Sequence, residues 1–408
     1  MAEKIAAVAT GHARTGIGIL RLSGDGCIEA AGQVFQLQSG KPLSSLPDRK
    51  LALGTLFDVQ GRPIDHCMAF ISRAPHSYTG EDTAEIQCHG SPAALAAGLE
   101  ALFAAGFRQA RPGEFTRRAF LNGRMDLTQA EAVIDLIDAE TPAAARQAAG
   151  QLNGALSRQI DGIYSALTDL MAHFCAVLDY PDEDIDPFQA EQMGQILVRQ
   201  EAALQALLAT SRRGTLLNQG ITCVLIGRPN AGKSSLLNAL AGYERAIVTN
   251  IPGTTRDTVE TKVTLGGYLF RLVDTAGLRD SDDPIEQLGV ARSRQALAEA
   301  DLVLAVCDGT QPLTEEDHDL LREALVQADT ILLANKRDLP DFALPQPAAN
   351  DAPNTLTVVP LSAKTGDGLD TLETTLAQRA ETLLPQAAQS AAGELLTNQR
   401  QTQAAQRA

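Results

Sequence analysis

Residues 227–234 read Gly227-Arg228-Pro229-Asn230-Ala231-Gly232-Lys233-Ser234. An apolar, strand-like run from Ile221 to Ile226 precedes this stretch, and a helical run from Ser235 to Leu240 follows it. A glycine-rich loop between a strand and a helix suits phosphate binding, because its glycines let backbone N–H groups approach the phosphate oxygens. In such a loop Lys233 reaches the β- and γ-phosphates and the Ser234 hydroxyl binds Mg²⁺. The stretch therefore predicts an α/β domain that binds a nucleoside triphosphate.

The γ-phosphate side of this site is predicted from two further segments. Asp274-Thr275-Ala276-Gly277 follows an apolar run from Tyr268 to Val273 and has the form Asp-x-x-Gly, which senses the γ-phosphate through Mg²⁺ and a backbone amide. Between it and the phosphate loop, Gly253-Thr254-Thr255-Arg256-Asp257 supplies a second hydroxyl, that of Thr255. We expect Ser234 and Thr255 to bind Mg²⁺.

The base is predicted from Asn335-Lys336-Arg337-Asp338, which follows an apolar run from Thr330 to Ala334. The Asp338 carboxylate can accept two N–H bonds from the edge of guanine. Adenine cannot supply them, and an unpaired buried acceptor would reject ATP. Ser362-Ala363-Lys364 follows another run, Leu356 to Leu361, and fits the loop behind the guanine.

All these segments except residues 253–257 stand directly after a predicted strand, where ligands bind on open α/β sheets, so we expect GTP. The predicted GTP-binding residues are Asn230, Ala231, Gly232, Lys233, Ser234, Ser235, Thr249, Asn250, Ile251, Pro252, Gly253, Thr254, Thr255, Asp274, Thr275, Ala276, Gly277, Asn335, Lys336, Arg337, Asp338, Ser362, Ala363 and Lys364.

The composition is typical of an intracellular protein. The 408 residues are enough for two or three domains. No apolar run has the length of a membrane span and the N-terminus lacks the apolar core of a signal peptide, so we expect a soluble, cytoplasmic protein with no membrane partner. The net charge of −16 argues against a broad nucleic-acid-coating surface and leaves room for a local basic patch.

The cysteines show no paired spacing. We expect them to be small buried hydrophobic residues without a disulfide or zinc role. His89 adjoins Cys88, but no second pair of ligands accompanies them, which makes a zinc site improbable. The cysteines are Cys27, Cys67, Cys88, Cys175, Cys223 and Cys307.

The composition and periodicity of the sequence change three times along the chain. Residues 1–118 mix strand-like segments with one alanine-rich helix, an α+β pattern. Residues 119–218 are rich in Ala, Leu and Gln, which is typical of a helical bundle. Residues 219–382 alternate strand and helix, and the helical texture returns in residues 383–408. We predict a multidomain α/β plus all-α protein in which a Ras-like, doubly wound α/β domain is inserted in a helical domain whose two parts pack together.

Outside the nucleotide motifs, the chain resembles the MnmE (TrmE) family of tRNA-modifying GTPases. The resemblance covers nearly the whole chain, and unrelated GTPases have no equivalent of its N-terminal half. It rests on four segments, Gly16-Ile17-Gly18-Ile19-Leu20-Arg21-Leu22-Ser23-Gly24, Ser77-Tyr78-Thr79-Gly80-Glu81-Asp82, Arg111-Pro112-Gly113-Glu114-Phe115-Thr116 and residues 118–132.

The resemblance implies an N-terminal domain that binds 5-formyltetrahydrofolate and forms a homodimer, followed by a helical domain with an inserted G domain. It implies a heterotetramer with the flavoprotein MnmG. The two proteins together would modify C5 of the wobble uridine (position 34) of certain tRNAs. The enzyme would be a GTP hydrolase, acting on an acid anhydride. The alternative is an Era- or Der-like switch in ribosome assembly that performs no group transfer; such chains lack the N-terminal segments quoted above.

The residues that hydrolyse GTP are inferred partly from this resemblance. A Ras-type enzyme orients water with a glutamine just after the Asp-x-x-Gly motif, and here that position is Leu278, which cannot form a hydrogen bond. The resemblance implies Glu286 as the catalytic replacement, whereas without it Glu286 would be read as a solvated loop acid.

The positive charge that an arginine finger supplies elsewhere is expected from K⁺. The Asn230 side chain can offer a carbonyl oxygen to this ion, and the resemblance implies further oxygens from Thr249, Ile251 and Thr254. The alternative role of Asn230 is to hold the phosphate loop by a bond to the backbone.

The N-terminal site is predicted from charge. A carboxylate such as Glu81 suits the pterin edge of a folate, while Arg21 and Arg124 suit its acidic or formyl side; each taken alone would be a surface charge or an ion pair. Residues 108–124 hold five arginines against one acid, which makes this segment a candidate tRNA-phosphate patch. Pairing of some of these arginines with acids of the helical domain is equally open. The five are Arg108, Arg111, Arg117, Arg118 and Arg124.

The sequence departs from the family pattern at two places. The family ends in a Cys-x-Gly-Lys tail, and this sequence stops at Ala408 without one, so we expect residues 383–408 to be a truncated part of the helical domain. On its unfinished helix we expect Leu395 and Leu396 to form an exposed apolar stripe. Arg124 stands where relatives often have Lys, which keeps the charge and changes the shape.

Overall fold

The computed structural model describes residues 3–11, 13–180, 190–242, 260–274, 295–346, 356–384 and 392–408. The chain divides into two units, Met1–Val133 and Ile134–Ala408. The helix α4 (Leu127–Ile137) spans the division.

The first unit is an α+β domain. Its strands are β1 (Ile5–Val8), β2 (Thr15–Ser23), β3 (Phe35–Leu37), β4 (Ala52–Phe57), β5 (Pro63–Ser72), β6 (Thr83–Gly90) and β7 (Arg108–Gln109), and its helices are α1 (Cys27–Ala31), the short 3₁₀ helix η1 (Leu43–Ser45), α2 (Pro92–Ala104) and α3 (Glu114–Leu121).

The strands form one sheet of seven in the order β3-β4-β5-β6-β2-β1-β7. Neighbours are antiparallel except β1 and β7, which are parallel. Buried and exposed residues alternate along β4, β5 and β6, so one face of the sheet is apolar, and α2 packs on it. The core of this unit includes Leu20, Leu22, Ile71, Ile86 and Leu102.

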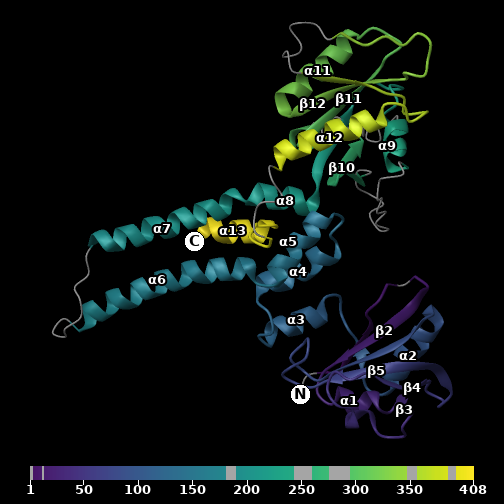
Figure 1. Ribbon diagram of the computed structural model, residues 1–408, viewed down its shortest axis with the longest axis vertical. Helices are drawn as coiled ribbons and strands as arrows, with labels where there is room; N and C mark the ends of the chain where they lie inside the picture. The colour runs from purple at the N-terminus through teal and green to yellow at the C-terminus, as the bar shows by residue number, and fades with distance from the viewer. Residues whose placement is uncertain are drawn as a thin grey trace, which may run out of the picture. The chain divides into compact units, whose positions relative to one another are not determined.

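The second unit contains the helical domain. Its helices are α5 (Pro142–Leu152), α6 (Ala155–Asp179), α7 (Ala190–Ala209), α8 (Ser211–Gln219) and α13 (Gln399–Arg407). The Thr141 side chain accepts a hydrogen bond from the Ala144 N–H, and Pro142 occupies the first turn, so local sequence starts α5. The long helices α6 and α7 lie side by side, with α13 beside α7 (Figure 1).

The second unit also contains an α/β domain of six strands. Its elements are β8 (Ile221–Ile226), α9 (Lys233–Ala241), β9 (Glu260–Leu265), β10 (Tyr268–Asp274), β11 (Leu302–Asp308), α11 (Glu315–Gln327), β12 (Asp329–Asn335), β13 (Thr357–Pro360) and α12 (Leu369–Leu383). The strand order is β13-β12-β11-β8-β10-β9, and only β9 is antiparallel to its neighbour. One face of the sheet packs on α9 and α12 and the other on α11 (Figure 1). The predicted doubly wound α/β fold is confirmed.

The insertion of this α/β domain into the helical domain is also confirmed, because residues after α12 return to the helices before it. The Leu395 carbonyl accepts hydrogen bonds from the Gln147 and Gln151 side chains of α5, at 3.3 and 2.6 Å. The Leu396 N–H donates to the Thr210 hydroxyl at 3.1 Å.

The expectation for Leu395 and Leu396 was wrong. Both are buried, at 3% and 1% exposure, and both precede α13. At Gly214 of α8, a Cβ would lie 2.0 Å from the Leu396 carbonyl. The returning segment therefore passes directly over α8, and its two leucines face inward to cover the helical core.

The expectation that all six cysteines are buried was wrong for one of them. Five are buried. Cys175 is exposed, as are the neighbouring residues 171–174 toward the end of α6. None of the described helices is long and apolar enough to cross a membrane.

Candidate functional site

The loop between β8 and α9 is held against the ends of the neighbouring strands. A Cβ at Gly227 would lie 2.1 Å from the Val306 carbonyl of β11, and a Cβ at Gly232 would lie 2.1 Å from Nδ2 of Asn335. Both glycines have positive φ, 143° and 99°. A side chain at either position would push the loop off the sheet edge.

Lys233 and Ser234 stand at the start of α9 and face this loop. Lys233 is 6% exposed, and its Nζ donates to the carbonyls of Gly227 and Arg228, at 2.7 and 2.9 Å. Phosphate oxygens can accept the same hydrogen bonds from Lys233 in place of these carbonyls. The Ser234 hydroxyl donates to the Asp274 carboxylate, at 3.1 Å. A hydroxyl and a carboxylate this close form the hard oxygen set that Mg²⁺ prefers, so the residues fit that ion.

Asn335 ties two predicted segments together. Its Nδ2 donates to the Ala231 carbonyl at 2.9 Å, and its Oδ1 accepts from the Ala363 N–H at 3.0 Å. The side chain is 3% exposed, so the two bonds are shielded from water. One buried amide thus sets the distance between the phosphate loop and residues 362–364.

The predicted guanine side lies at the ends of β12 and β13. The buried Ser362 hydroxyl donates to Oδ1 of the exposed Asp338 carboxylate at 2.7 Å. A carboxylate can accept about four hydrogen bonds, so this orienting bond leaves Asp338 able to accept others. Arg337 and Lys364 are exposed beside it.

Asp308 was missed by the sequence reasoning. It ends β11, and its carboxylate accepts from Lys336 Nζ at 2.6 Å. Burial raises the pKa of Asp308, but hydrogen bonds from Lys336 and Thr310 outweigh it and hold that pKa below its usual value. Lys336 has a positive φ of 68°, so the ion pair also holds a strained backbone position. The position of Asp308 directly after the apolar run of residues 302–307 was the signal in the sequence that could have identified it.

Arg228 has a structural role that the sequence analysis did not predict. Its Nε donates to the Asp317 carboxylate at 2.9 Å. Asp317 forms a capping box with Thr314 at the start of α11, and the spacing Thr-x-x-Asp was visible in the sequence. The phosphate loop is thus attached to α11 as well as to the sheet.

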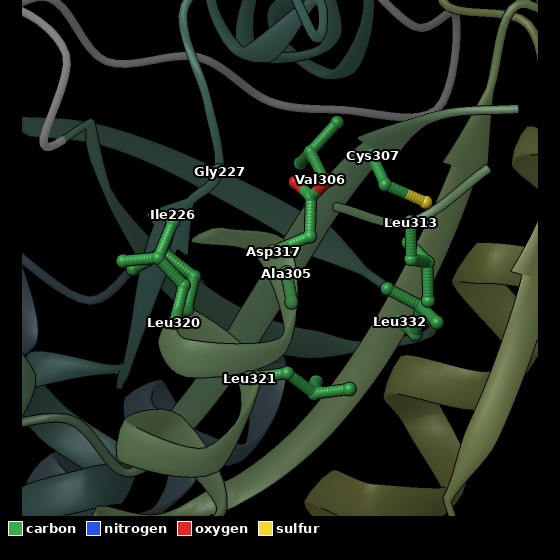
Figure 2. A pocket seen from close by; sticks show the side chains of 10 residues that line it. All are labelled: Ile226, Gly227, Ala305, Val306, Cys307, Leu313, Asp317, Leu320, Leu321 and Leu332. Atoms are coloured by element: carbon green, nitrogen blue, oxygen red, sulfur yellow. The ribbon is translucent and has the colours of Figure 1, made fainter. Parts of the chain in front are cut away.

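A small cavity lies beside this attachment, between α11 and the strands β8, β11 and β12. Its volume is about 20 Å³, and apart from Asp317 and Gly227 its walls are apolar side chains such as Leu313, Leu320 and Leu332 (Figure 2). It has room for about one water molecule. The cavity is therefore a packing defect behind the phosphate loop and too small for a nucleotide.

Several predicted residues lie outside the described residues. They are Thr249, Asn250, Ile251, Pro252, Gly253, Thr254, Thr255, Thr275, Ala276, Gly277, Leu278 and Glu286. Of the predicted K⁺ ligands only Asn230 is described. It is exposed in the phosphate loop and has a φ of 64°.

In the first unit, Glu81 lies in a network of hydrogen bonds. Its carboxylate accepts from the Ser23 hydroxyl at 2.7 Å and from Arg118 at 2.8 Å. Ser23 also shares a hydrogen bond of 2.7 Å with Thr79, and both are fully buried. The resemblance segments that contain Ser23, Thr79 and Arg118 therefore meet at Glu81.

Arg21 and Arg124 differ in their surroundings. Arg21 donates to Glu85 at 2.7 Å, and its guanidinium lies over the rings of Tyr78 and Phe115, 5.6 and 5.9 Å from their centroids. Arg124 is exposed. Tyr78 and Phe115 were missed as candidate site residues, although both stand inside the resemblance segments.

The arginine-rich segment is partly neutralised. Arg108 pairs with Glu3 and Glu114, and Arg118 pairs with Glu114 and Glu81. Hydrogen bonds from Arg108, then from the Arg111 N–H and Arg118, lower the pKa of Glu114 to about 2 despite its burial. The acids lie in the first unit and not in the helical domain, which corrects the alternative stated above. The exposed arginines of the segment are Arg111, Arg117 and Arg124.

Matches to known proteins span nearly the whole chain. Residues 4–124 match the family described as the GTP-binding protein TrmE N-terminus, and residues 127–408 match the MnmE helical domain. The tRNA modification GTPase MnmE of Symbiobacterium thermophilum is 45% identical over 407 residues, which cover 100% of this chain and 87% of that protein. The MnmE of Thermus thermophilus is also 45% identical, over 100% of this chain and 88% of that protein.

Among solved structures, the G domain of the T. maritima FeoB iron transporter is 30% identical over 39% of this chain and 98% of its own, with a TM-score of 0.28.

Proposed function

Because this chain belongs to the MnmE (TrmE) family, we propose that it is a tRNA modification GTPase that binds and hydrolyses GTP. The observation that carries the proposal is the pair of hydrogen bonds through which Asn335 joins the phosphate loop to residues 362–364. This bridge gives the phosphate-binding and base-binding segments a fixed separation, as one nucleotide requires.

In this proposal Lys233 exchanges its two loop carbonyls for the β- and γ-phosphates. Mg²⁺, when bound at Ser234 and Thr255 near Asp274, would neutralise phosphate charge. Asp338, oriented by Ser362, would accept the guanine N–H groups. Glu286 would act as the catalytic residue that polarises water, since Leu278 cannot.

We also propose that K⁺ stimulates hydrolysis, with oxygens from Asn230, Thr249, Ile251 and Thr254. The supporting observation is that Asn230 is exposed within the phosphate loop, where its carbonyl can reach an ion. GTP hydrolysis measured in KCl and NaCl at matched ionic strength tests this. We expect a rate at least about 10-fold higher in KCl and a lost K⁺ response in Asn230→Ala. Equal rates in the two salts would remove K⁺ from the mechanism.

For the first unit we propose a folate site built from Arg21, Glu81 and Arg124, with 5-formyltetrahydrofolate as the one-carbon source. Two observations support it: Glu81 is oriented by Ser23 and Arg118, and Arg21 lies over two aromatic rings that can also stack on a pterin. In the same proposal residues 1–118 form a homodimer, residues 119–218 and 383–408 the helical domain, and residues 219–382 the G domain.

The proposed reaction is modification of C5 of the wobble uridine with the flavoprotein MnmG in a cytoplasmic complex, driven by the GTP cycle. Its test is mass spectrometry of digested tRNA from cells that lack their own enzyme and express this chain. Restored modification, lost when the exposed Arg124 is replaced by Ala, supports the proposal. Absence of the modification, together with K⁺-dependent GTP hydrolysis and binding to ribosomal subunits, would favour the ribosome-assembly alternative. Family membership disfavours that alternative because the match to residues 4–124 covers the half that Era- and Der-like chains lack.

A further inference from the structure

Two buried cysteines face each other across neighbouring strands of the seven-stranded sheet. The pairing of β5 with β6 places Met68 opposite Gln87, so the next step places Cys67 opposite Cys88. The Cys88 thiol donates to Cys67 Sγ, with 3.9 Å between the sulfur atoms. The two residues are 5% and 3% exposed.

A carboxylate completes a group of three donors. Asp65 Oδ, Cys67 Sγ and Cys88 Sγ all lie within 4.8 Å of one another, and in the described part of the chain no other such group has the spacing of a metal site. Asp65 accepts from the backbone N–H and from Nδ1 of His89, at 2.7 and 2.9 Å. A carboxylate offers about four acceptor positions, so these two bonds orient Asp65 and leave it able to bind an ion.

The separation of the two hydrogen-bonded thiols is also compatible with two ligands of one metal ion. Two thiolates bound to one tetrahedral zinc ion at about 2.3 Å lie about 3.8 Å apart, close to the 3.9 Å between Cys67 and Cys88. A disulfide requires sulfur atoms about 2.0 Å apart. An ion therefore needs little movement of the two thiols, whereas a disulfide needs them to approach.

The surroundings leave these donors facing one another. Gly54 lies beside Cys67 and Gly18 beside Cys88 in the sheet, so neither cysteine has a neighbouring side chain on its outer side. Phe35 and Leu95 fill those two spaces, since a Cβ at Gly54 or Gly18 would lie 2.5 or 2.6 Å from them. Apolar walls beside two thiols and a carboxylate limit the access of water to these donors.

The pair of thiols is also electrostatically uneven. The hydrogen bond from Cys88 lowers the pKa of Cys67, and the same bond with burial raises the pKa of Cys88. Zinc binding displaces the thiol protons, because both sulfur atoms bind the metal as thiolates.

We propose that Cys67, Cys88 and Asp65 bind one Zn²⁺ ion and that His89 positions Asp65. The site would join β5 and β6 at the end of this strand pair opposite the loop, residues 73–82, that carries Glu81. It is therefore separate from the proposed folate and GTP sites, and its failure would leave both intact.

The test is metal uptake by the full chain, reduced and stripped of metal with a chelator. Zn²⁺ is titrated against a chromophoric competitor, and Co²⁺ is used as a spectroscopic probe. We expect one Zn²⁺ per chain and an intense near-ultraviolet sulfur-to-cobalt charge-transfer band. Cys67→Ser and Cys88→Ser should abolish both, while Cys27→Ser, a control at a buried cysteine outside the group, should change neither.

The two other variants separate ligation from positioning. Asp65→Asn should weaken Zn²⁺ binding at least about 10-fold because it removes the anionic ligand. His89→Gln should also weaken it about 10-fold while keeping the charge-transfer band, because both thiolates still bind the metal.

A wild-type measurement covers the case in which a cysteine variant does not fold. Zn²⁺ should slow alkylation of Cys67 and Cys88, mapped by mass spectrometry, and should not slow alkylation of the exposed Cys175. The proposal is overturned if the reduced chain takes up no Zn²⁺, if Cys67→Ser binds as much as the wild type, or if the two thiols form a disulfide that metal does not prevent.

Discussion

The carboxyl edge of the six-stranded sheet and the network around Glu81 on the seven-stranded sheet are both polar sites, but they are held in different ways. At the six-stranded sheet, Lys233 and Asn335 bond to backbone groups of nearby loops, and one ion pair, between Lys336 and Asp308, accompanies them. At the seven-stranded sheet, Glu81, Glu114, Arg108 and Arg118 bond to one another's side chains.

This difference predicts how each site responds to substitution. A side chain that bonds to backbone carbonyls can release them for a ligand without leaving a buried charge unpaired. Removal of one member of an ion-pair network instead leaves its partner uncompensated, which costs stability. We therefore expect substitutions at the first site to affect the nucleotide and substitutions at the second to affect folding.

The largest expected effect concerns catalysis in the domain of the six-stranded sheet, where Glu286 is the proposed catalytic residue. Glu286→Ala should lower the turnover number for GTP by about 100-fold or more, because general-base assistance is worth about that much. GTP affinity should stay close to that of the wild type, the pattern of a group used mainly in the transition state. Single-turnover hydrolysis and equilibrium GTP binding measure the two quantities. Asp283→Ala, at an acid three positions earlier in the sequence, is the control, and wild-type turnover in Glu286→Ala would show that another residue activates water.

The second expected effect concerns affinity at the same sheet. Asp338→Asn should raise the dissociation constant for GTP by about 10- to 100-fold, since a hydrogen bond to a charged group contributes about 1.5–3 kcal/mol. Xanthosine triphosphate, which carries a carbonyl where guanine carries an amino group, should bind this variant better than it binds the wild type. Fluorescent-nucleotide competition measures both affinities, with the exposed Asp341→Asn as control. Unchanged nucleotide preference would mean that Asp338 does not contact the base.

The third expected effect is on folding, at the seven-stranded sheet. The pKa of Glu114 is lowered from 4.5 to about 2 in the folded chain, so its ion pairs stabilise the fold above about pH 4.5 and lose that contribution as the pH falls toward 2. We expect Glu114→Gln to lower the free energy of unfolding at pH 7 by about 2 kcal/mol. Its stability should then fall less than that of the wild type between pH 4.5 and 2.

Urea unfolding at several pH values measures this dependence. Glu100→Gln, at an exposed acid on α2, should keep the wild-type pH profile. A Glu114→Gln profile parallel to that of the wild type throughout this window would contradict the role given to the ion pairs.

The smallest expected effect separates the paired arginines from the exposed ones. Arg117→Ala should change stability by no more than about 0.5 kcal/mol, because its side chain is exposed, and should weaken tRNA binding a few-fold with a shallower salt dependence. Arg118→Ala should instead destabilise the first unit, because it removes the cation that pairs with both Glu81 and Glu114. Thermal unfolding and tRNA binding at several salt concentrations compare the two. Equal losses of stability in both variants would contradict the distinction between paired and exposed arginines.

The strand, loop and helix around residues 227–234 could be predicted from the sequence because each of these parts is local. Ile221 to Ile226 forms β8 at the predicted bounds, and the glycines of the next loop are required by the close approach of Val306 and Asn335. Strand, loop and helix of this kind are decided within about ten residues by periodicity and by the backbone freedom of glycine. For that reason the sequence alone was sufficient to predict a doubly wound α/β domain with its polar residues at the strand ends.

Only the tertiary structure decided which distant side chains meet. The charge of Arg108 and Arg118 is visible in the sequence, but the pairing of Arg108 with Glu3 and of Arg118 with Glu81 depends on the tertiary structure of the first unit. Cys67 meets Cys88 for the same reason, because the register of β5 with β6 is set by the buried face of the sheet. Leu395 was expected at the surface and is buried, because residues on both sides of the inserted domain form one helical core. Composition records that a residue is charged or apolar, and long-range packing selects its partner.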